Sequence, residues 1–240
     1  MNFKKRLKKA PYLLLLFLVF YCSKPIEPKG EITTQKIDIQ PFTHLKLKGK
    51  FRAFYKKSDK NFIDIETYPN IFDNLSIENK GDSLIISEKK PIKKVDFYNV
   101  DIYTNAEIHS IIMSDAVEMN TDNDLVSPKI HLNLKDHSKF IGGFDTQQIF
   151  INMSNLSLMN CKGKAKKAYI RLVDTANFLS PYFLVDNMTL KSKNQTYTEV
   201  NVKDTLRVDV QDTSKLLYYN QPVRDFKVGE NTKVNHQKLN

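Results

Sequence analysis

The sequence of 240 residues contains little cysteine, little glycine and no tryptophan. Of its two cysteines, Cys22 directly follows an apolar run and Cys161 lies far along the chain. If Cys22 is modified, Cys161 has no partner and no disulfide framework is available. We therefore expect Cys161 to be a buried small hydrophobe at a strand end rather than a nucleophile.

The sequence also lacks the short motifs of the common enzyme classes. It contains no G-x-S-x-G, C-x-x-C, phosphate-binding P-loop or dinucleotide fingerprint. Its histidines show no H-x-x-x-H metal spacing, so each is expected to be a surface or strand residue. They are His44, His109, His131, His137 and His236. The sequence therefore predicts no catalytic residue, no metal site and no cofactor.

The longest uninterrupted apolar run is Tyr12–Tyr21, which ends at Cys22. As a helix it would reach about 15 Å, roughly half of a bilayer core, so it is a poor transmembrane span. Five basic residues precede it, and a basic head with a short apolar run is typical of a secretory signal. We predict that residues 1–21 are a signal peptide; an anchor that stays uncleaved is the alternative.

Cys22, placed directly at the end of this run, resembles the lipobox cysteine of bacterial lipoproteins, although Tyr21 stands where that pattern has a small residue. The resemblance implies a lipid on Cys22 and a location in the cell envelope, at the outer membrane or the periplasmic face. Residues 22–36 contain prolines and a glycine without apolar periodicity, and predict a flexible tether. An ordinary signal peptide remains open.

Charge argues against nucleic acid as a partner. Residues 1–21 hold five basic and no acidic side chains, so removing them lowers the formal charge from +10 to +5. The densest remaining basic cluster is short and surrounds Gly163, and it is expected to be a solvated turn. Its members are Lys162, Lys164, Lys166 and Lys167.

One short pattern returns about every twenty residues between Ile111 and Val234, and it dominates the rest of the chain. Its copies end at Met119, Phe140, Leu158, Phe178, Thr198, Leu216 and Val234, with spacings of 21, 18, 20, 20, 18 and 18 residues. A repeat of this period is typical of a solenoid, in which each unit buries its apolar face by stacking on the next.

Between the turns the residues alternate strictly, as in Ile149–Met153 and Leu206–Val210, which indicates strands rather than helices. We predict an all-β fold, a single-stranded right-handed parallel β-helix (β-solenoid) over residues 37–236; a β-sandwich or a β-propeller is the alternative. The N-terminal part predicts hairpin-like strands, clearest where Leu75–Glu78 and Ser83–Ile86 flank a turn with Gly81. Pro69–Asn74 predicts a short helical turn.

Three segments carry a family resemblance: Phe42–Gly49, Asn74–Ile86 and Leu217–Val234, the last with Tyr218-Tyr219-Asn220-Gln221-Pro222. In this order they resemble landmarks of the bacterial "putative auto-transporter adhesin, head GIN domain" family. The resemblance implies a secreted or lipid-anchored β-helical envelope protein. The repeated Gly-Ser-Gly turns of that family are replaced here by sequences such as Asp136-His137-Ser138, whose residues carry a Cβ.

The repeat places a row of aspartates after successive strands, with Ser154, Asn194 and Glu230 at the remaining positions. Such residues satisfy turn backbone groups, and turn capping is the first interpretation. The second interpretation is that these residues are surface contacts for a polysaccharide or protein ligand. An aromatic platform for sugars is a further interpretation of Tyr182, Tyr197, Tyr218 and Tyr219. The aspartates are Asp115, Asp136, Asp174 and Asp212.

Together these observations favour a non-catalytic envelope lipoprotein that contacts a ligand or serves in adhesion. Its partners would be a membrane, through the lipid on Cys22, and a polysaccharide or protein. One alternative is a β-helical carbohydrate-active enzyme, a lyase or hydrolase, with a carboxylate pair and a basic residue in a groove. The other is a structural envelope component whose exposed terminal coil pairs with another strand.

Overall fold

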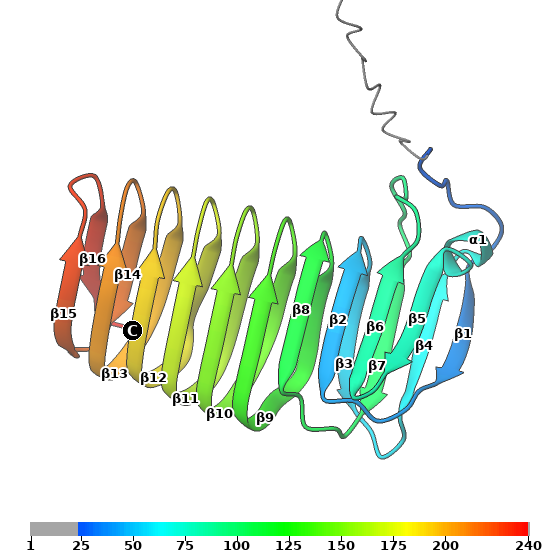
Figure 1. Cartoon of the computed structure of the whole chain (residues 1–240), viewed down its shortest axis with the longest axis horizontal. Helices are drawn as coiled ribbons and strands as arrows, with labels where there is room; N and C mark the ends of the chain where they lie inside the picture. The colour runs from blue at the N-terminus through cyan, green and yellow to red at the C-terminus, as the bar shows by residue number, and fades with distance from the viewer. Residues whose placement is uncertain (1–23, 240) are drawn as a thin grey trace, which may run out of the picture.

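The computed structural model describes residues 24–239, which form the predicted parallel β-solenoid. The fold is nearly all strand, 66% against 2% helix, and makes about seven turns (Figure 1). Residues 1–21, predicted as a signal peptide, and Cys22 lie outside the described residues. Strands of the regular part are β8 (Ser110–Asp115), β9 (Glu118–Leu134), β10 (Lys139–Met153), β11 (Leu158–Leu172), β12 (Asn177–Ser192), β13 (Tyr197–Val210), β14 (Lys215–Tyr219), β15 (Val223–Val228) and β16 (Lys233–Gln237).

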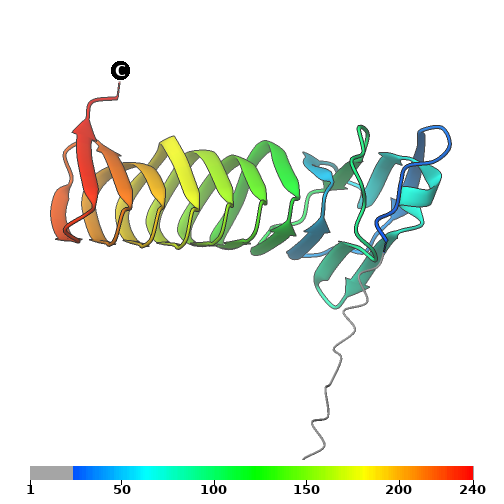
Figure 2. The same ribbon diagram turned by 90° about the horizontal axis from the view of Figure 1, so that it is seen from above.

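Each long strand bends once, so that one coil contributes to both faces of a flattened solenoid, as the view from above shows (Figure 2). Parallel pairing continues through the coils, with Phe140 opposite Met159 and Phe150 opposite Tyr169. Gly163 lies at the bend of β11 with φ of 98°, and a Cβ there would lie 2.2 Å from the carbonyl oxygen of Phe144. The close coil-to-coil approach at this bend therefore requires glycine.

The pairing corrects the alignment of the third repeat copy. Met119 pairs with Phe140, Phe140 with Met159, and Met159 with Phe178. The third copy therefore ends at Met159, one residue later than the Leu158 that the pattern predicts. The error arises because Ser154 and Asn155 both suit the turn, and only the hydrogen-bonded register distinguishes the two alignments.

The N-terminal part mixes parallel and antiparallel pairs. β2 pairs in parallel with β6 and β8, while β3 pairs in parallel with β7 and β9. The predicted hairpin is confirmed as β5–β6, and the predicted helical turn as α1. Antiparallel β1 and β4 add to β7 and close this end (Figure 1). The bounds are β1 (Thr33–Asp38), β2 (His44–Gly49), β3 (Arg52–Lys57), β4 (Phe62–Thr67), α1 (Pro69–Phe72), β5 (Leu75–Lys80), β6 (Ser83–Glu88) and β7 (Asn99–Thr104).

Residues 24–36 differ from the flexible tether predicted for 22–36. Ile26 forms a parallel bridge with Ile92, and its backbone N–H donates to the Pro91 carbonyl at 2.9 Å. β1 begins already at Thr33 and pairs with β4 over its whole length. The part before β1 lacks periodicity because it docks on a loop, at Ile92, rather than on a regular strand.

The interior is a continuous apolar stack along the coils. Phe140, Phe144 and Phe183 are fully buried, with ring centroids of Phe140 and Phe144 5.2 Å apart. Cys161 is buried as predicted, its Sγ lying 3.2 Å from Ser180 Oγ, and burial raises the pKa of this thiol to about 12. In-register parallel stacking of like side chains therefore supplies the stabilisation that one coil alone could not.

The C-terminal coil ends differently from the interior coils. Arg224 stands opposite the buried Leu206, at an inward position that is left exposed because the stack ends here, and its Nη1 donates to the Tyr218 hydroxyl at 3.1 Å. His236 stacks on Tyr218 with ring centroids 4.8 Å apart. Polar groups thus join the apolar stack at this end, where Phe226 and Val234 still pack against the core.

Candidate functional site

The predicted aspartates lie along one edge of the solenoid, in the turns that join the two faces (Figure 1). In each turn of this row one Asp or Asn has a φ between 59° and 73°. These two residue types tolerate the left-handed region best after glycine, which explains how the chain dispenses with glycine here. Glu230 is not among the positive-φ residues, and Asn155 takes the place predicted for Ser154. In chain order they are Asp115, Asp136, Asn155, Asp174, Asn194 and Asp212.

From Asp136 onward the row alternates between Asp and Asn, and the alternation makes a hydrogen-bonded ladder. The Asn155 amide donates to Asp136 Oδ1, and the Asn194 amide donates to Asp174 Oδ1, each at 2.9 Å. The second carboxylate oxygen accepts a backbone N–H from the preceding coil, as Asp212 Oδ2 does from Asn194 at 3.1 Å. The alternation supplies each carboxylate with donors and keeps carboxylates out of neighbouring coils.

The ladder breaks its alternation at its N-terminal end, where Asp115 and Asp136 stand in adjacent coils. These two predicted contacts share a recess of about 590 Å³ with Glu88 and several lysines, whereas Asp174 and Asp212 do not line it. Glu88 Oε1 accepts the Lys50 backbone N–H at 2.7 Å. Burial, and less strongly the charge of Asp115, raise the pKa of the Glu88 carboxyl.

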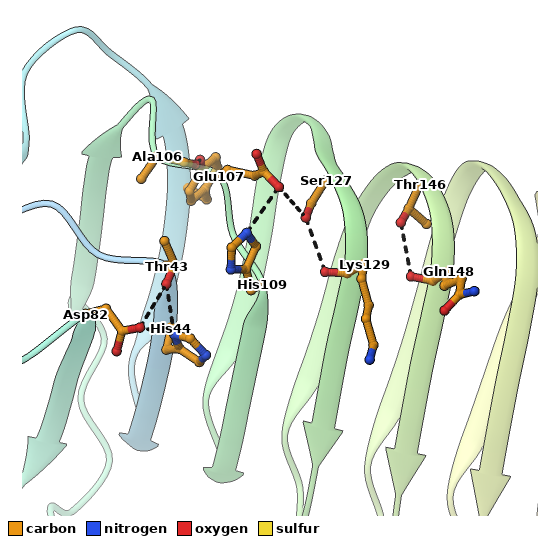
Figure 3. Close-up of polar contacts among 11 residues, drawn as sticks. Thr43, His44, Asp82, Ala106, Glu107, His109, Ser127, Lys129, Thr146 and Gln148 are labelled. Carbon is orange, nitrogen blue, oxygen red and sulfur yellow. Dashed lines mark hydrogen bonds and ion pairs between the residues drawn. The ribbon is translucent and has the colours of Figure 1, made fainter.

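A second hollow, the histidine groove, opens on one face where β2, β8 and β9 meet, and has a volume of about 600 Å³ (Figure 3). Its side chains come from three neighbouring chain segments. The backbone N–H of His131 donates to the His109 carbonyl, and that of His109 to the Thr43 carbonyl, each at 2.8 Å. The groove is defined by His44, Glu107, His109, Ser127, Lys129 and His131.

Glu107 organises the polar groups of the histidine groove (Figure 3). Its Oε1 accepts the Ser127 hydroxyl at 2.9 Å and lies 3.1 Å from His109 Nε2. The carboxylate therefore stands between serine and histidine, so His109 is not placed to take the proton of Ser127 as the histidine of a nucleophilic triad does. The arrangement suits hydrogen bonding to a polar ligand.

Charges around the groove nearly balance. His44 Nδ1 lies 3.2 Å from Asp82 Oδ2, and the ammonium group of Lys129 lies 5.1 Å from the centre of the Phe150 ring. Burial, followed by the charges of Lys129 and His44, lowers the pKa of His131, which keeps this imidazole neutral at pH 7. The groove thus combines the ammonium group of Lys129, the carboxylate of Glu107 and the neutral imidazole of His131, with Asp82 beside it at His44.

Aromatic rings continue from the groove along the same face. His131, Phe150 and Tyr169 stack at 4.7 and 4.8 Å between ring centroids, with interplanar angles of 10° and 11°. Stacking covers the ring faces and leaves edges toward solvent, so the row braces the coils rather than forming a platform on which sugar rings lie.

The four tyrosines predicted as a platform differ in exposure. Tyr218 and Tyr219 are buried at the C-terminal end, and Tyr197 donates its hydroxyl to Glu199 at 2.5 Å. Tyr182 is exposed on the bend of β12. Sequence reasoning missed the histidine groove, although His109 and His131 are separated by 22 residues, one coil of the repeat, and this spacing could have indicated that they are neighbours.

Among residues 24–239, no group of three or more His, Cys, Asp or Glu side chains is arranged to hold a metal ion. Over the same residues no helix has the length and apolar character needed to cross a bilayer.

A family model described as "Putative auto-transporter adhesin, head GIN domain" matches residues 41–222. Among solved structures, a "putative adhesin" from Bacteroides fragilis has a TM-score of 0.80 at 14% identity, covering 89% of this chain and 100% of that one. No curated protein matches the chain.

Two further structures share the fold. A "putative adhesin" from Parabacteroides merdae has a TM-score of 0.69 at 14% identity, covering 90% of this chain and 100% of the other. Another from Parabacteroides distasonis has a TM-score of 0.72 at 16% identity, covering 88% and 99%. At these identities the likeness shows a common fold.

Proposed function

We propose that this chain, which belongs to the family described as "Putative auto-transporter adhesin, head GIN domain", is a non-catalytic contact protein of the cell envelope that binds a neutral polysaccharide in its histidine groove. The adhesin-like family suggests a cell-surface or envelope location. The groove supplies the contact surface, and a lipid on Cys22 supplies the attachment to the membrane.

The observation that carries the proposal is Glu107 in its groove. Its carboxylate is half exposed, is held by Ser127 and His109, and faces an open hollow; Glu107 lies in the loop before β8, and Ser127 ties it to β9. Sugar hydroxyls can donate to this carboxylate and accept from Lys129, while the near balance of charge favours no strongly charged ligand. The side chains need little reordering on binding, which lowers the entropic cost of contact.

Two alternatives have less support. A β-helical lyase or hydrolase would use a carboxylate pair with a cation, but Asp136 uses one oxygen for the Asn155 amide and the other for the Asp115 N–H. A structural component that adds a strand to the terminal coil would bury Arg224, which faces inward there. Inward-pointing charges are a known means of blocking such edge pairing.

Affinity electrophoresis of the full chain through gels containing a neutral glucan, mannan or galactan tests the groove. The wild type should be retarded in at least one gel. Glu107→Gln and Lys129→Ala should each weaken binding about tenfold, since each loses a charged hydrogen-bond partner. Gln148→Ala is the matched control, because Gln148 pairs with Lys129 one coil further on and lies outside the groove. Absence of retardation, or equal effects of Lys129→Ala and Gln148→Ala, would contradict the proposal.

Metabolic labelling with a palmitate analogue tests the anchor separately. The wild-type chain should be labelled and Cys22→Ala should not, because the thiol is the acceptor. Cys161→Ala serves as the control and should be labelled like the wild type, since Cys161 is buried in the core. An unlabelled wild type would remove the lipid anchor from the proposal and leave the groove unaffected.

A further inference from the structure

The first described residues are fixed to the N-terminal end of the solenoid. Lys93 donates its backbone N–H to the Ile26 carbonyl at 2.9 Å, completing the bridge between Ile26 and Ile92. Asn70 holds the same segment, donating its amide to the Glu27 carbonyl at 2.8 Å and accepting the Lys29 N–H at 2.9 Å. Ile26 follows Cys22 by four positions, and a chain of that length spans about 14 Å at most. A lipid on Cys22 would therefore keep this end of the domain close to the bilayer.

The surface around this segment is basic. We define the anchor face as residues 24–31 and 89–97. These two segments contain six lysines and three carboxylates, which gives a formal charge of +3. That is more than half of the +5 left after residues 1–21 are removed. All six lysines are exposed, and Phe97 beside them is 42% exposed. The lysines are Lys24, Lys29, Lys89, Lys90, Lys93 and Lys94.

Few ion pairs neutralise this charge, although Lys89 and Lys90 also line the recess that holds the carboxylates of Glu88, Asp115 and Asp136. Lys93 forms an ion pair with Glu27, and Asp96 accepts the hydroxyl of Tyr68 at 2.9 Å. Lys89 donates to the backbone carbonyl of Asp73 at 2.9 Å, which leaves its charge unneutralised. The loop therefore offers cations and one aromatic ring to a partner that is anionic at its surface and apolar below it.

We propose that the anchor face docks on the anionic phospholipid headgroups of the membrane that holds the lipid, and so sets the orientation of the solenoid. The docking rests on the proposed lipid anchor, which places the face at the bilayer. Each basic residue near an anionic surface contributes about fivefold to the partition, so a net +3 amounts to about 100-fold over an uncharged surface. The attraction falls off within a Debye length, about 8 Å at physiological salt.

A second lysine cluster provides a matched control. Lys162, Lys166 and Lys167 lie at the bend of β11, on the long edge opposite the turns, and Lys164 beside them is paired with Asp145 at 3.2 Å. Figure 1 shows this bend and the loop between β6 and β7 at opposite edges. A general attraction to anionic vesicles would involve both clusters, whereas docking of the anchor face involves one.

The test uses the full lipidated chain reconstituted into vesicles of phosphatidylcholine with or without phosphatidylglycerol. A phosphatidylglycerol content of about 30% gives a strongly anionic surface. An uncharged acylating reagent then reports the reactivity of each lysine by mass spectrometry. On anionic vesicles Lys89, Lys90 and Lys94 should react several-fold more slowly than on neutral ones, and salt at about 0.5 M should abolish the difference. Lys162, Lys166 and Lys167 should react equally on both.

Two triple variants complete the design: Lys89, Lys90 and Lys94→Gln, and Lys162, Lys166 and Lys167→Gln. Both leave the ion-paired lysines in place, and circular dichroism melting checks that they fold. The first should expose Lys24 and Lys29 to the reagent on anionic vesicles, and the second should not. Equal reactivity on both vesicles, with palmitate label present, would refute the docking and leave the anchor intact. If the chain carries no palmitate label but its anchor-face lysines still react more slowly when anionic vesicles are added, the lipid anchor is refuted and the docking of the anchor face is supported.

Discussion

Asn194→Asp tests the reason for the alternating ladder. In the wild type the Asn194 amide donates to Asp174 Oδ1, and its backbone N–H donates to Asp212 Oδ2. The substitution keeps the side-chain shape but removes the amide donor and places carboxylates in three successive coils. The carboxylates of Asp174 and Asp212 then repel the new carboxylate, and the turn loses the charge-assisted hydrogen bond from the Asn194 amide to Asp174.

The magnitude follows from the coil spacing. At about 4.8 Å and a water-like dielectric, each like-charge pair costs about 0.9 kcal/mol, hence about 2 kcal/mol for two neighbours. The lost hydrogen bond to a carboxylate adds about 1.5 kcal/mol, the lower end of the usual range, because the turn is partly exposed. The free energy of unfolding should therefore fall by about 3 kcal/mol at pH 7 and low salt.

Urea unfolding followed by circular dichroism measures the loss. At about pH 3, below the usual aspartate pKa, most of the repulsion should vanish, and salt at about 1 M should reduce it at pH 7. Asn194→Gly is the control, because it keeps the positive φ and loses only the amide; its deficit should stay near 1.5 kcal/mol and be insensitive to salt. A deficit of Asn194→Asp below about 0.5 kcal/mol, or one that neither pH nor salt changes, would refute the reasoning.

Three further perturbations probe other parts of the chain. Burial raises the pKa of the Glu88 carboxyl, so the folded protein holds this proton more tightly and loses stability as the pH rises through the folded pKa. Glu88→Gln should therefore be more stable than the wild type at pH 7. In urea titrations this difference should vanish below about pH 4, where the carboxyl is protonated in both states. Phe144→Ala should lower the free energy of unfolding by about 3–5 kcal/mol, since the ring is fully buried, and a loss below about 1 kcal/mol would contradict the packing. Arg224→Val should cause self-association in size-exclusion chromatography because it removes the inward charge of the terminal coil, whereas Arg207→Val, on an outward position, should stay monomeric.

Much of the fold could be predicted because its determinants are local. Alternation of apolar residues indicates strands, and the Asp or Asn in each turn marks where a coil reverses. The β5–β6 hairpin around Gly81 was predictable for the same reason. The one misaligned copy, Ser154 in place of Asn155, shows the limit: several polar residues suit a turn, and hydrogen bonds between coils decide which one takes the positive φ.

The candidate site was less predictable because its members come from different coils. His44 precedes His109 by 65 residues, and the two meet only because β2 pairs with β8. The docked segment 24–30 likewise depends on a bridge to Ile92 that no local pattern encodes. The lipid on Cys22 stays a prediction, since that residue lies outside the described part of the chain.

By itself the sequence determined the architecture of the chain: a period near twenty residues, with alternating strands and Asp or Asn turns, leaves a stacked β-solenoid as the arrangement that buries every apolar row. Only the tertiary structure decided what the polar residues do. It turned the aspartate row into a ladder of turn caps, and it assembled the histidine groove and the anchor face. The physical reason is that the alternation of residues along each strand decides which side chains are buried, whereas contacts between polar groups depend on the register of coils far apart in the sequence.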